Sequence, residues 1–392
     1  MNKRTDTILD EVLDRQLPEH PTRPTRKFEP WHKPRKQFIR RHQWLAETVQ
    51  LCAKLKFRDD RPLKYLSLPG EDLLDVRVIH ECCEGLGISL RYLGLNESYS
   101  SSDPDTWLHL AWNEVNSLKA VDGNSIVIRD RFERIADTKS QAFQYIEQYG
   151  SFDVVNMDLC ESISAPTGKK NIPNYYSALK SLAGYQIKNR TEPWLLLITS
   201  RVGETKVDAG DMNKLVDCLR LNARQYEAFR KRLIHLIPKA SRLTTNSALE
   251  TNKLSQSEFV MVFSAGLGKW LLGLMSSGSP KWGVLLQSSY SYRVHAQEPD
   301  MVSYAFLLEP FIQSPIDTTG LSRVVITDDR ELDDEESALA LLSKIDGIED
   351  LDMIVRAKPA LKKQLQNESE ALLASAGYNP KPYRNWLKSL PA

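Results

Sequence analysis

An alternation of two kinds of segment, from Pro62 to about Leu236, constrains the fold of this 392-residue chain more than any other feature. The apolar runs of strand length are LKYLSL, SLRYLGL, SIVIRD, FDVVNMDL and PWLLLITSRV. Each is followed by an amphipathic segment of helix length; the first of these helices is predicted from about Asp72 to Leu86 and the last from about Asp211 to Leu236. Strands and helices that alternate in this way form an α/β domain with a mostly parallel sheet and helices on both faces.

The rhythm changes after residue 255. A helical stretch, SEFVMVFSAGLGKWLLGLM, precedes two β-rich runs, WGVLLQSSYSYRV and MVSYAFLLEPF, which are separated by HAQEPD. Runs this close together predict an antiparallel hairpin that completes the sheet. Beyond Leu321 come a short strand-like run (SRVVIT), the acidic DDRELDDEE and several helical pieces. We therefore expect an arm and helix over residues 1–60, an α/β domain over 61–315, and an acidic linker with a small helical module over 316–392.

The arm has the most unusual composition in the chain. Its prolines favour an extended path as far as Pro34, where helical spacing of apolar residues begins. Aromatic residues are interleaved with eight cations: Arg23, Arg26, Lys27, Lys33, Arg35, Lys36, Arg40 and Arg41. Such a segment could bind nucleic acid by contacting phosphates and stacking on bases. Alternatively, it packs its aromatic residues on its own domain or on a protein partner and covers the sheet.

Net charge, cysteine content and hydropathy limit the remaining classes of function. The formal net charge is only +1, so attraction to nucleic acid would depend on a local cluster such as the arm. The 5 cysteines are scattered and odd in number, which does not fit a disulfide framework and favours a reducing cytoplasm. No apolar segment of roughly 18 uninterrupted residues is present, so we expect no membrane partner. Cysteine and histidine spacings predict no metal site.

Five β/α units followed by a β-hairpin resemble the class I S-adenosylmethionine-dependent methyltransferases, which have a Rossmann-type fold. The resemblance covers roughly residues 62–311. It implies that S-adenosylmethionine is a candidate cofactor. In LSLPGEDLLD, at the place of the family's glycine-rich turn, it implies cofactor contacts for Gly70 and Glu71. In LRYLGLNE and IVIRD it implies Glu97 on the ribose hydroxyls and Asp130 beside the adenine.

The fourth strand, FDVVNMDLCE, carries the residues that the resemblance places near the methionine part and the substrate. These are Asp158, Cys160 and Glu161, which are the candidate catalytic residues. Arg201, at the end of the fifth strand, could bind phosphate or pair with a neighbouring acid. Asp153 begins the fourth strand at the opposite edge of the sheet, where we expect a structural role.

The turn after the first strand departs from the family pattern. A G-x-G turn lets backbone approach a ligand closely, but here only Gly70 remains, and Pro69 lacks an N–H. Glu71 and Asp72 would also place two negative charges beside an anionic ligand at the N-terminus of the predicted helix. The first hypothesis is therefore a degenerate cofactor site in a nucleic-acid-binding or assembly component, similar to accessory proteins of bacterial anti-phage systems. The second is an active methyltransferase acting on nucleic acid or protein, and a third is another nucleotide-linked enzyme that uses the same sheet edge.

Overall fold

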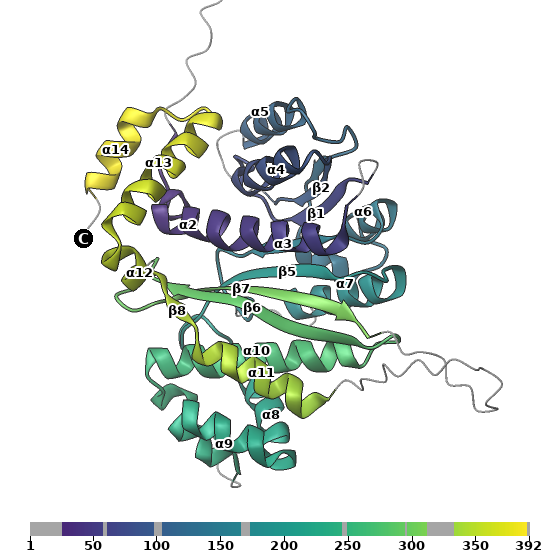
Figure 1. Cartoon of the computed structure of the whole chain (residues 1–392), viewed down its shortest axis with the longest axis vertical. Helices are drawn as coiled ribbons and strands as arrows, with labels where there is room; N and C mark the ends of the chain where they lie inside the picture. The colour runs from purple at the N-terminus through teal and green to yellow at the C-terminus, as the bar shows by residue number, and fades with distance from the viewer. Residues whose placement is uncertain are drawn as a thin grey trace, which may run out of the picture.

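The computed structural model describes residues 26–57, 61–97, 104–165, 173–244, 249–294, 296–311 and 333–389. Its centre is an eight-stranded sheet with the order β3-β2-β1-β4-β5-β7-β6-β8 (Figure 1). The strands are β1 (Leu63–Ser67), β2 (Leu90–Leu95), β3 (Ile126–Ile128), β4 (Val154–Asp158), β5 (Trp194–Arg201), β6 (Trp282–Tyr292), β7 (Met301–Pro310) and β8 (Glu349–Asp350). The first five are parallel, and β7 lies antiparallel between β5 and β6. The predicted sheet and hairpin are confirmed, and this order is consistent with a Rossmann-like methyltransferase fold.

Helices cover both faces of the sheet, because alternate side chains of each strand point to opposite sides. Tyr65 of β1 belongs to one apolar core and Leu66 to the other. The first core is covered by α3 (Ala46–Leu55), α4 (Leu74–Leu86) and α5 (Pro104–Asn116). The second is covered by α6 (Gln141–Tyr149), α7 (Tyr175–Asn189), α8 (Ala209–Gln225), α10 (Gln256–Ser276) and α11 (Asp334–Asp346).

Two predicted helices have different limits in the structure. The segment predicted as one helix from Asp211 to Leu236 is divided into α8 and α9 (Glu227–Leu236) by Tyr226, which is extended (φ −117°, ψ 119°). The break lets α9 pack against α11 while α8 packs against α10. The helix predicted from Asp72 begins at Leu74, because Leu73 adopts a left-handed conformation (φ 50°). Asp72 therefore lies in the preceding turn and is not a first-turn residue.

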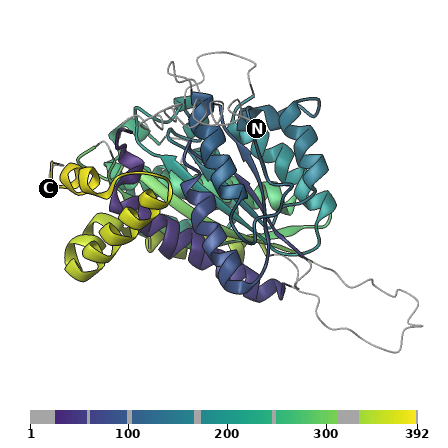
Figure 2. The same ribbon diagram turned by 90° about the horizontal axis from the view of Figure 1, so that it is seen from above.

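The N-terminal arm joins the C-terminal helices in a small third core. A 3₁₀ turn (Pro30–His32) leads into α2 (Pro34–Phe38), a π-helical segment (Ile39–Leu45) and then α3. Helices α13 (Pro359–Ser375) and α14 (Pro380–Ser389) lie beside this arm, as Figures 1 and 2 show. The core contains Val78 of α4, Leu372 of α13 and Tyr383 of α14, and Phe28 of the arm packs against it. The helical C-terminal segments predicted from sequence are thus present, and they pack on the arm.

The acidic run contributes to the start of α11. Asp333 accepts hydrogen bonds from the backbone N–H groups of Glu335 and Glu336, as an N-cap does. The remaining connection, α12 (Leu351–Ala357), follows the short strand β8. The predicted SRVVIT strand and Arg23 lie outside the described residues.

Helix α10 is long and apolar enough to cross a membrane by length and composition alone. However, 72% of its most apolar window is buried inside the protein. A helix that is apolar all round and buried in this way is a core helix of a globular fold.

Candidate ligand-binding site

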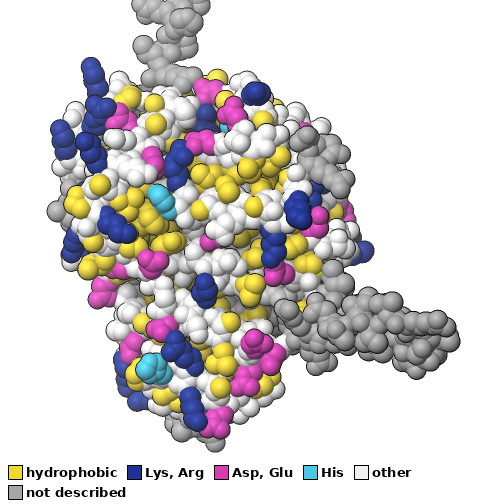
Figure 3. All heavy atoms as spheres, viewed as in Figure 1, with side chains coloured by type: hydrophobic (Ala, Val, Ile, Leu, Met, Phe, Trp, Pro, Cys, Tyr) yellow, Lys and Arg dark blue, Asp and Glu magenta, His cyan; other side chains and the backbone are white. Residues whose placement is uncertain are grey.

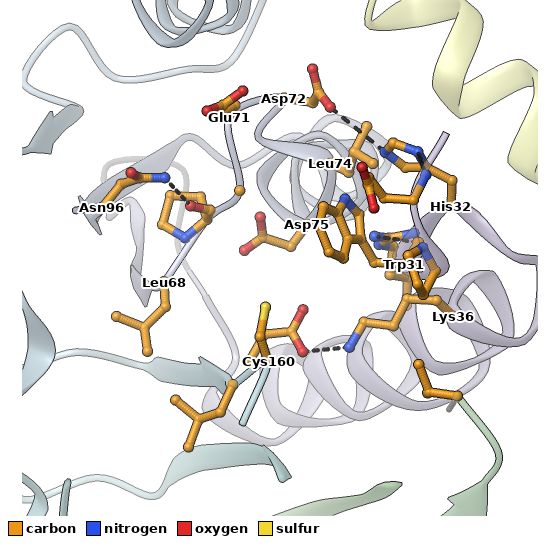
Figure 4. Close-up of a pocket in the computed structure, with 18 of the residues that line it drawn as sticks. Trp31, His32, Lys36, Leu68, Glu71, Asp72, Leu74, Asp75, Asn96 and Cys160 are labelled. Atoms are coloured by element: carbon orange, nitrogen blue, oxygen red, sulfur yellow. Dashed lines mark hydrogen bonds and ion pairs between the residues drawn. The ribbon is translucent and has the colours of Figure 1, made fainter. Parts of the chain in front are cut away.

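A cavity of about 930 Å³ lies at the carboxyl ends of β1, β2, β3 and β4 (Figure 4). The residues that follow these strands form one wall, and the arm, from Arg26 to Arg40, contributes the opposite wall. Open α/β sheets bind their ligands at this edge, and the volume lies within the range of small-molecule sites. The sheet topology therefore brings most of the predicted strand-end residues to a single cavity.

The turn after β1 is held by contacts that the sequence did not reveal. Asn96 donates a hydrogen bond from Nδ2 to the carbonyl oxygen of Pro69 at 2.8 Å (Figure 4). A Cβ added to Gly94 would lie 2.9 Å from Cγ of Pro69 and 3.0 Å from Val127, whereas one added to Gly70 would meet nothing within 4 Å. The glycine that this turn requires is thus Gly94 on the neighbouring strand, while Gly70 leaves open space beside the cavity.

A buried polar cluster lies beneath the turn. Asp75, in the first turn of α4, accepts hydrogen bonds from the hydroxyls of Tyr65, at 2.8 Å, and Ser67. Asn156 donates to the Tyr65 hydroxyl at 2.8 Å. Burial raises the pKa of Asp75, although the two hydroxyl donors act in the opposite direction. Asp75 was not predicted from the sequence, in which its only signal is an acid near the start of the helix that follows β1.

Glu97 and Asp130, which the resemblance places beside the adenosine part of the cofactor, both line the cavity. Each also interacts with other residues of the chain. Glu97 forms an ion pair with Arg131. Asp130 accepts hydrogen bonds from the backbone N–H groups of Arg131, at 2.8 Å, and Ala142, at 3.1 Å. Asp130 therefore fixes the loop between β3 and α6 whether or not it also contacts a ligand. Glu97 would have to exchange Arg131 for a ligand hydroxyl.

The structure separates the three candidate catalytic residues. Asp158 and Cys160 line the cavity, and Asp158 forms an ion pair with Lys36 of the arm (Figure 4). Glu161 instead forms an ion pair with Arg201 at 3.2 Å and does not line the cavity. The arginine at the end of β5 thus pairs with a neighbouring acid, which was one of its two predicted roles.

Cys160 is an exposed thiol on the cavity wall. Desolvation by the surrounding protein and the charge of Asp158 raise its pKa, so the thiol is the predominant form at neutral pH. This disfavours a role as a nucleophile. Within the described ranges, no three His, Cys, Asp or Glu side chains are grouped so as to hold a metal ion.

Asp72 joins the arm, the turn before α4 and the C-terminal region. Its carboxylate forms an ion pair with Arg26, accepts a hydrogen bond from Tyr378 at 2.8 Å and lies 3.8 Å from Nε2 of His32. Burial by itself would raise the pKa of Asp72, but His32, Arg26 and Tyr378 together lower it. The arm is therefore fixed over the cavity by an ionised carboxylate.

Most of the arm's cations interact within the chain. The carboxylate pairs are Arg26 with Asp72, Arg35 with Asp352, Lys36 with Asp158, and Arg41 with Glu81 and Glu368. Arg40 is buried, Lys33 is half-buried and Lys27 is exposed. Figure 3 shows cationic and acidic side chains interspersed on one face of the molecule. The arm thus forms a wall of the cavity, as one of its two interpretations predicted, and nucleic-acid binding stays a prediction.

Comparison with known proteins places the chain in a family. The family model described as PP_RS20740-like matches residues 25–388. The chain belongs to this family. No curated protein matches it. Among solved structures, loganic acid methyltransferase with SAH is similar at 8% sequence identity and a TM-score of 0.30, over 73% of this chain and 98% of that chain.

Proposed function

We propose that this family member is a methyltransferase-like protein that binds an adenosine-containing ligand of the S-adenosylmethionine class. The observation that carries the proposal is the cavity at the sheet edge, which is lined by all the predicted cofactor-binding and catalytic residues except Glu161. The members that line it are Gly70, Glu71, Glu97, Asp130, Asp158 and Cys160.

The residues around the cavity fit such a ligand. Leu95, Phe132 and Tyr175 provide apolar and aromatic surface beside the ends of β2 and β3, which suits a purine ring. Glu97, on the same wall, would accept hydrogen bonds from ribose hydroxyls. The open space beside Gly70 leaves room for ligand atoms close to the backbone of the turn.

The ion pair between Asp158 and Lys36 on the cavity wall favours ligand binding over efficient methyl transfer. When bound, S-adenosylmethionine supplies an electrophilic methyl group on a sulfonium cation. That cation would compete with Lys36 for the carboxylate of Asp158, whereas the neutral thioether of S-adenosylhomocysteine would not. The raised pKa of Cys160, which favours the neutral thiol, points in the same direction. The proposal therefore keeps the methyltransferase-like core of the first hypothesis and differs from it in that the cofactor place still binds a ligand.

A role in nucleic-acid binding or in assembly with a protein partner, including in an anti-phage system, is an additional proposal. Its structural support is limited to Lys27 and Trp31, which are exposed on the arm. An exposed cation can contact a phosphate, and an exposed aromatic ring can stack on a base. Binding of an unstructured single strand measured over a salt series, with Lys27→Gln as the variant, tests this role separately.

Calorimetric titration with S-adenosylmethionine and S-adenosylhomocysteine tests the main proposal. We expect micromolar binding that Glu97→Ala weakens by about tenfold or more, the effect of losing hydrogen bonds to a charged group. The matched control is Glu161→Ala, which removes a carboxylate at the same sheet edge but outside the cavity, and should leave affinity unchanged. An absence of binding at millimolar ligand would refute the proposal.

A further inference from the structure

Arg40 lies on the wall of the cavity with hydrogen-bonding capacity that the protein does not use. It belongs to the π-helical segment after α2 and is only 5% exposed. Its Nη2 donates to the carbonyl oxygen of Trp31 at 3.2 Å, while its buried Nε has no hydrogen-bond partner among the described residues. No described carboxylate forms an ion pair with it. Because burying a charged group with unmet hydrogen bonds is costly, a hydrogen-bonded anion would stabilise this guanidinium.

The two nearest acids are engaged elsewhere. Asp158 is paired with Lys36, so these two charges offset one another. Asp75 accepts its hydrogen bonds from Tyr65 and Ser67. Burial lowers the pKa of Arg40 and the charges of Asp158 and Asp75 act against this, but neither acid is hydrogen-bonded to the guanidinium. Arg40 is therefore left without a hydrogen-bonded carboxylate among the described residues, although the charge of Asp75 acts on it.

Tyr292, at the end of β6, adds a second polar group to the same wall. It is 2% exposed and lines the cavity. Burial and the charge of Asp158 raise its pKa well above the ordinary value, while Arg40 acts in the opposite direction. Tyr292 thus keeps its proton at neutral pH and can donate a hydrogen bond.

We propose that Arg40 and Tyr292 form an anion subsite that binds a carboxylate or phosphate group of the cavity's ligand. A guanidinium binds either group through parallel hydrogen bonds, and a buried position strengthens them. Two sources share this chemistry: the amino-acid carboxylate of an S-adenosylmethionine-class ligand and the phosphate of a nucleotide. The identity of the ligand rests on the proposed function, whereas the existence of the subsite does not.

The first experiment tests the subsite without an adenosine ligand. Thermal unfolding of the full chain is measured with inorganic phosphate and with acetate, against sodium chloride at matched ionic strength. An anion that binds the folded state raises the melting temperature as its concentration exceeds the dissociation constant. We expect at least one of the two anions to produce this rise in the wild type and in Arg41→Met, and neither to produce it in Arg40→Met. Arg41 is the matched control, since it neighbours Arg40 but pairs with Glu81 outside the cavity.

The stability of the ligand-free variant separates a binding role from a structural one. Arg40→Met removes a buried guanidinium that has no hydrogen-bonded carboxylate while keeping much of the side-chain volume, so we expect a melting temperature equal to or above that of the wild type. A clear decrease would show that Arg40 is structural and would count against the subsite. Tyr292→Phe keeps the ring and removes only the hydroxyl, so it reports on anion binding if Arg40→Met does not fold. If the anion raises the melting temperature of Tyr292→Phe less than that of the wild type, the result supports the subsite. An equal rise in both proteins contradicts it.

Paired ligands identify the source of the anion. If Arg40 binds the carboxylate, Arg40→Met should lower affinity for S-adenosylhomocysteine by about tenfold to a hundredfold and leave that for 5′-methylthioadenosine, which lacks the amino-acid group, unchanged. If Arg40 instead binds phosphate, Arg40→Met should lower affinity for adenosine monophosphate and leave that for adenosine unchanged. Anion stabilisation through Arg40 without binding of either thioether would support the subsite and refute the proposed function. Equal affinities of wild type and Arg40→Met for every ligand and anion would refute the subsite alone.

Discussion

Lys36 of the arm and Asp158 at the end of β4 form an ion pair across the cavity, between residues 122 positions apart in the sequence. The Lys36 side chain is 7% exposed and that of Asp158 24%. The ammonium group also lies 4.5 Å from the ring centroid of Trp44, a cation–π distance. This pair links the arm to the sheet edge. It also engages the carboxylate of Asp158, which the resemblance places near the methionine part of a bound ligand.

Lys36→Met should free the carboxylate of Asp158 and change ligand preference. Without the competing ammonium, the sulfonium of S-adenosylmethionine gains an unpaired carboxylate, so its affinity should rise relative to that of neutral S-adenosylhomocysteine. We also expect a loss of about 1–3 kcal/mol of stability, because the remaining carboxylate is partly buried. Calorimetry with both ligands and urea unfolding measure the two effects.

The double variant Lys36→Met/Asp158→Asn is the control for this change. It removes both charges, so the shift in preference towards S-adenosylmethionine should disappear and part of the stability should return. An affinity ratio that is the same in the wild type and Lys36→Met would show that Asp158 does not lie near the sulfonium.

Gly94→Ala should lower stability, whereas Gly70→Ala should lower ligand affinity. An added Cβ at Gly94 meets Pro69 at 2.9 Å, so it should displace the turn and cost about 1–3 kcal/mol of stability, as overpacking does. An added Cβ at Gly70 meets nothing within 4 Å, so the stability of that variant should stay close to the wild type. If a ligand approaches the backbone at Gly70, its affinity should nevertheless fall. Urea unfolding and calorimetry of both variants check this, and equal destabilisation would contradict the assignment of Gly94 as the glycine that the turn requires.

The fold could be predicted because the parallel strands are buried on both faces and therefore appear as continuous apolar runs. PWLLLITSRV, for example, contains β5, all of whose residues are buried. Other elements left no such pattern. Strand β8 has only the two polar residues Glu349 and Asp350, held by backbone pairing to β6. The break at Tyr226 follows from the different partners of α8 and α9, which no local residue encodes.

The cavity could be predicted in part for a similar reason. Parallel strands end at one edge, so Glu97, Asp130 and Asp158 were expected to lie together. Their partners were not predictable, since Lys36 and Arg40 reach the cavity only through the path of the arm across the sheet edge. From sequence the arm's cations were equivalent, and it is burial that distinguishes Arg40 from its neighbour Arg41.

Asp153 should be structural and not functional, as its place at the start of β4 predicts. It is fully buried and accepts hydrogen bonds from Arg61 at 2.6 Å, Arg190 at 2.8 Å and the backbone N–H of Lys64 at 2.8 Å. Asp153→Ala leaves the buried Arg190 guanidinium without its carboxylate, which should cost about 3–5 kcal/mol. Urea unfolding measures this loss, and ligand affinity per folded molecule should not change.

Asp122→Ala is the matched comparison for Asp153→Ala. Its pair with Arg91 is more exposed, at 16% and 30% of the two side chains, so its loss should cost only about 0–1 kcal/mol. Similar costs for the two variants would show that burial does not determine the contribution of these pairs.

His32 should make the stability of the protein depend on pH. Its Nδ1 accepts a hydrogen bond from the backbone N–H of Glu29 at 3.0 Å, and Nε2 lies 3.8 Å from Asp72. Burial lowers the pKa of His32, although Asp72 acts in the opposite direction. With a folded pKa below the unfolded value of about 6.5, the contribution of His32 to stability is present above that pH and is lost as pH falls through the folded pKa.

His32→Gln should therefore show a smaller decrease in melting temperature than the wild type between about pH 7 and pH 5. The exposed His235 is the control, since His235→Gln should follow the wild type; a His32→Gln curve that also follows the wild type would contradict the prediction.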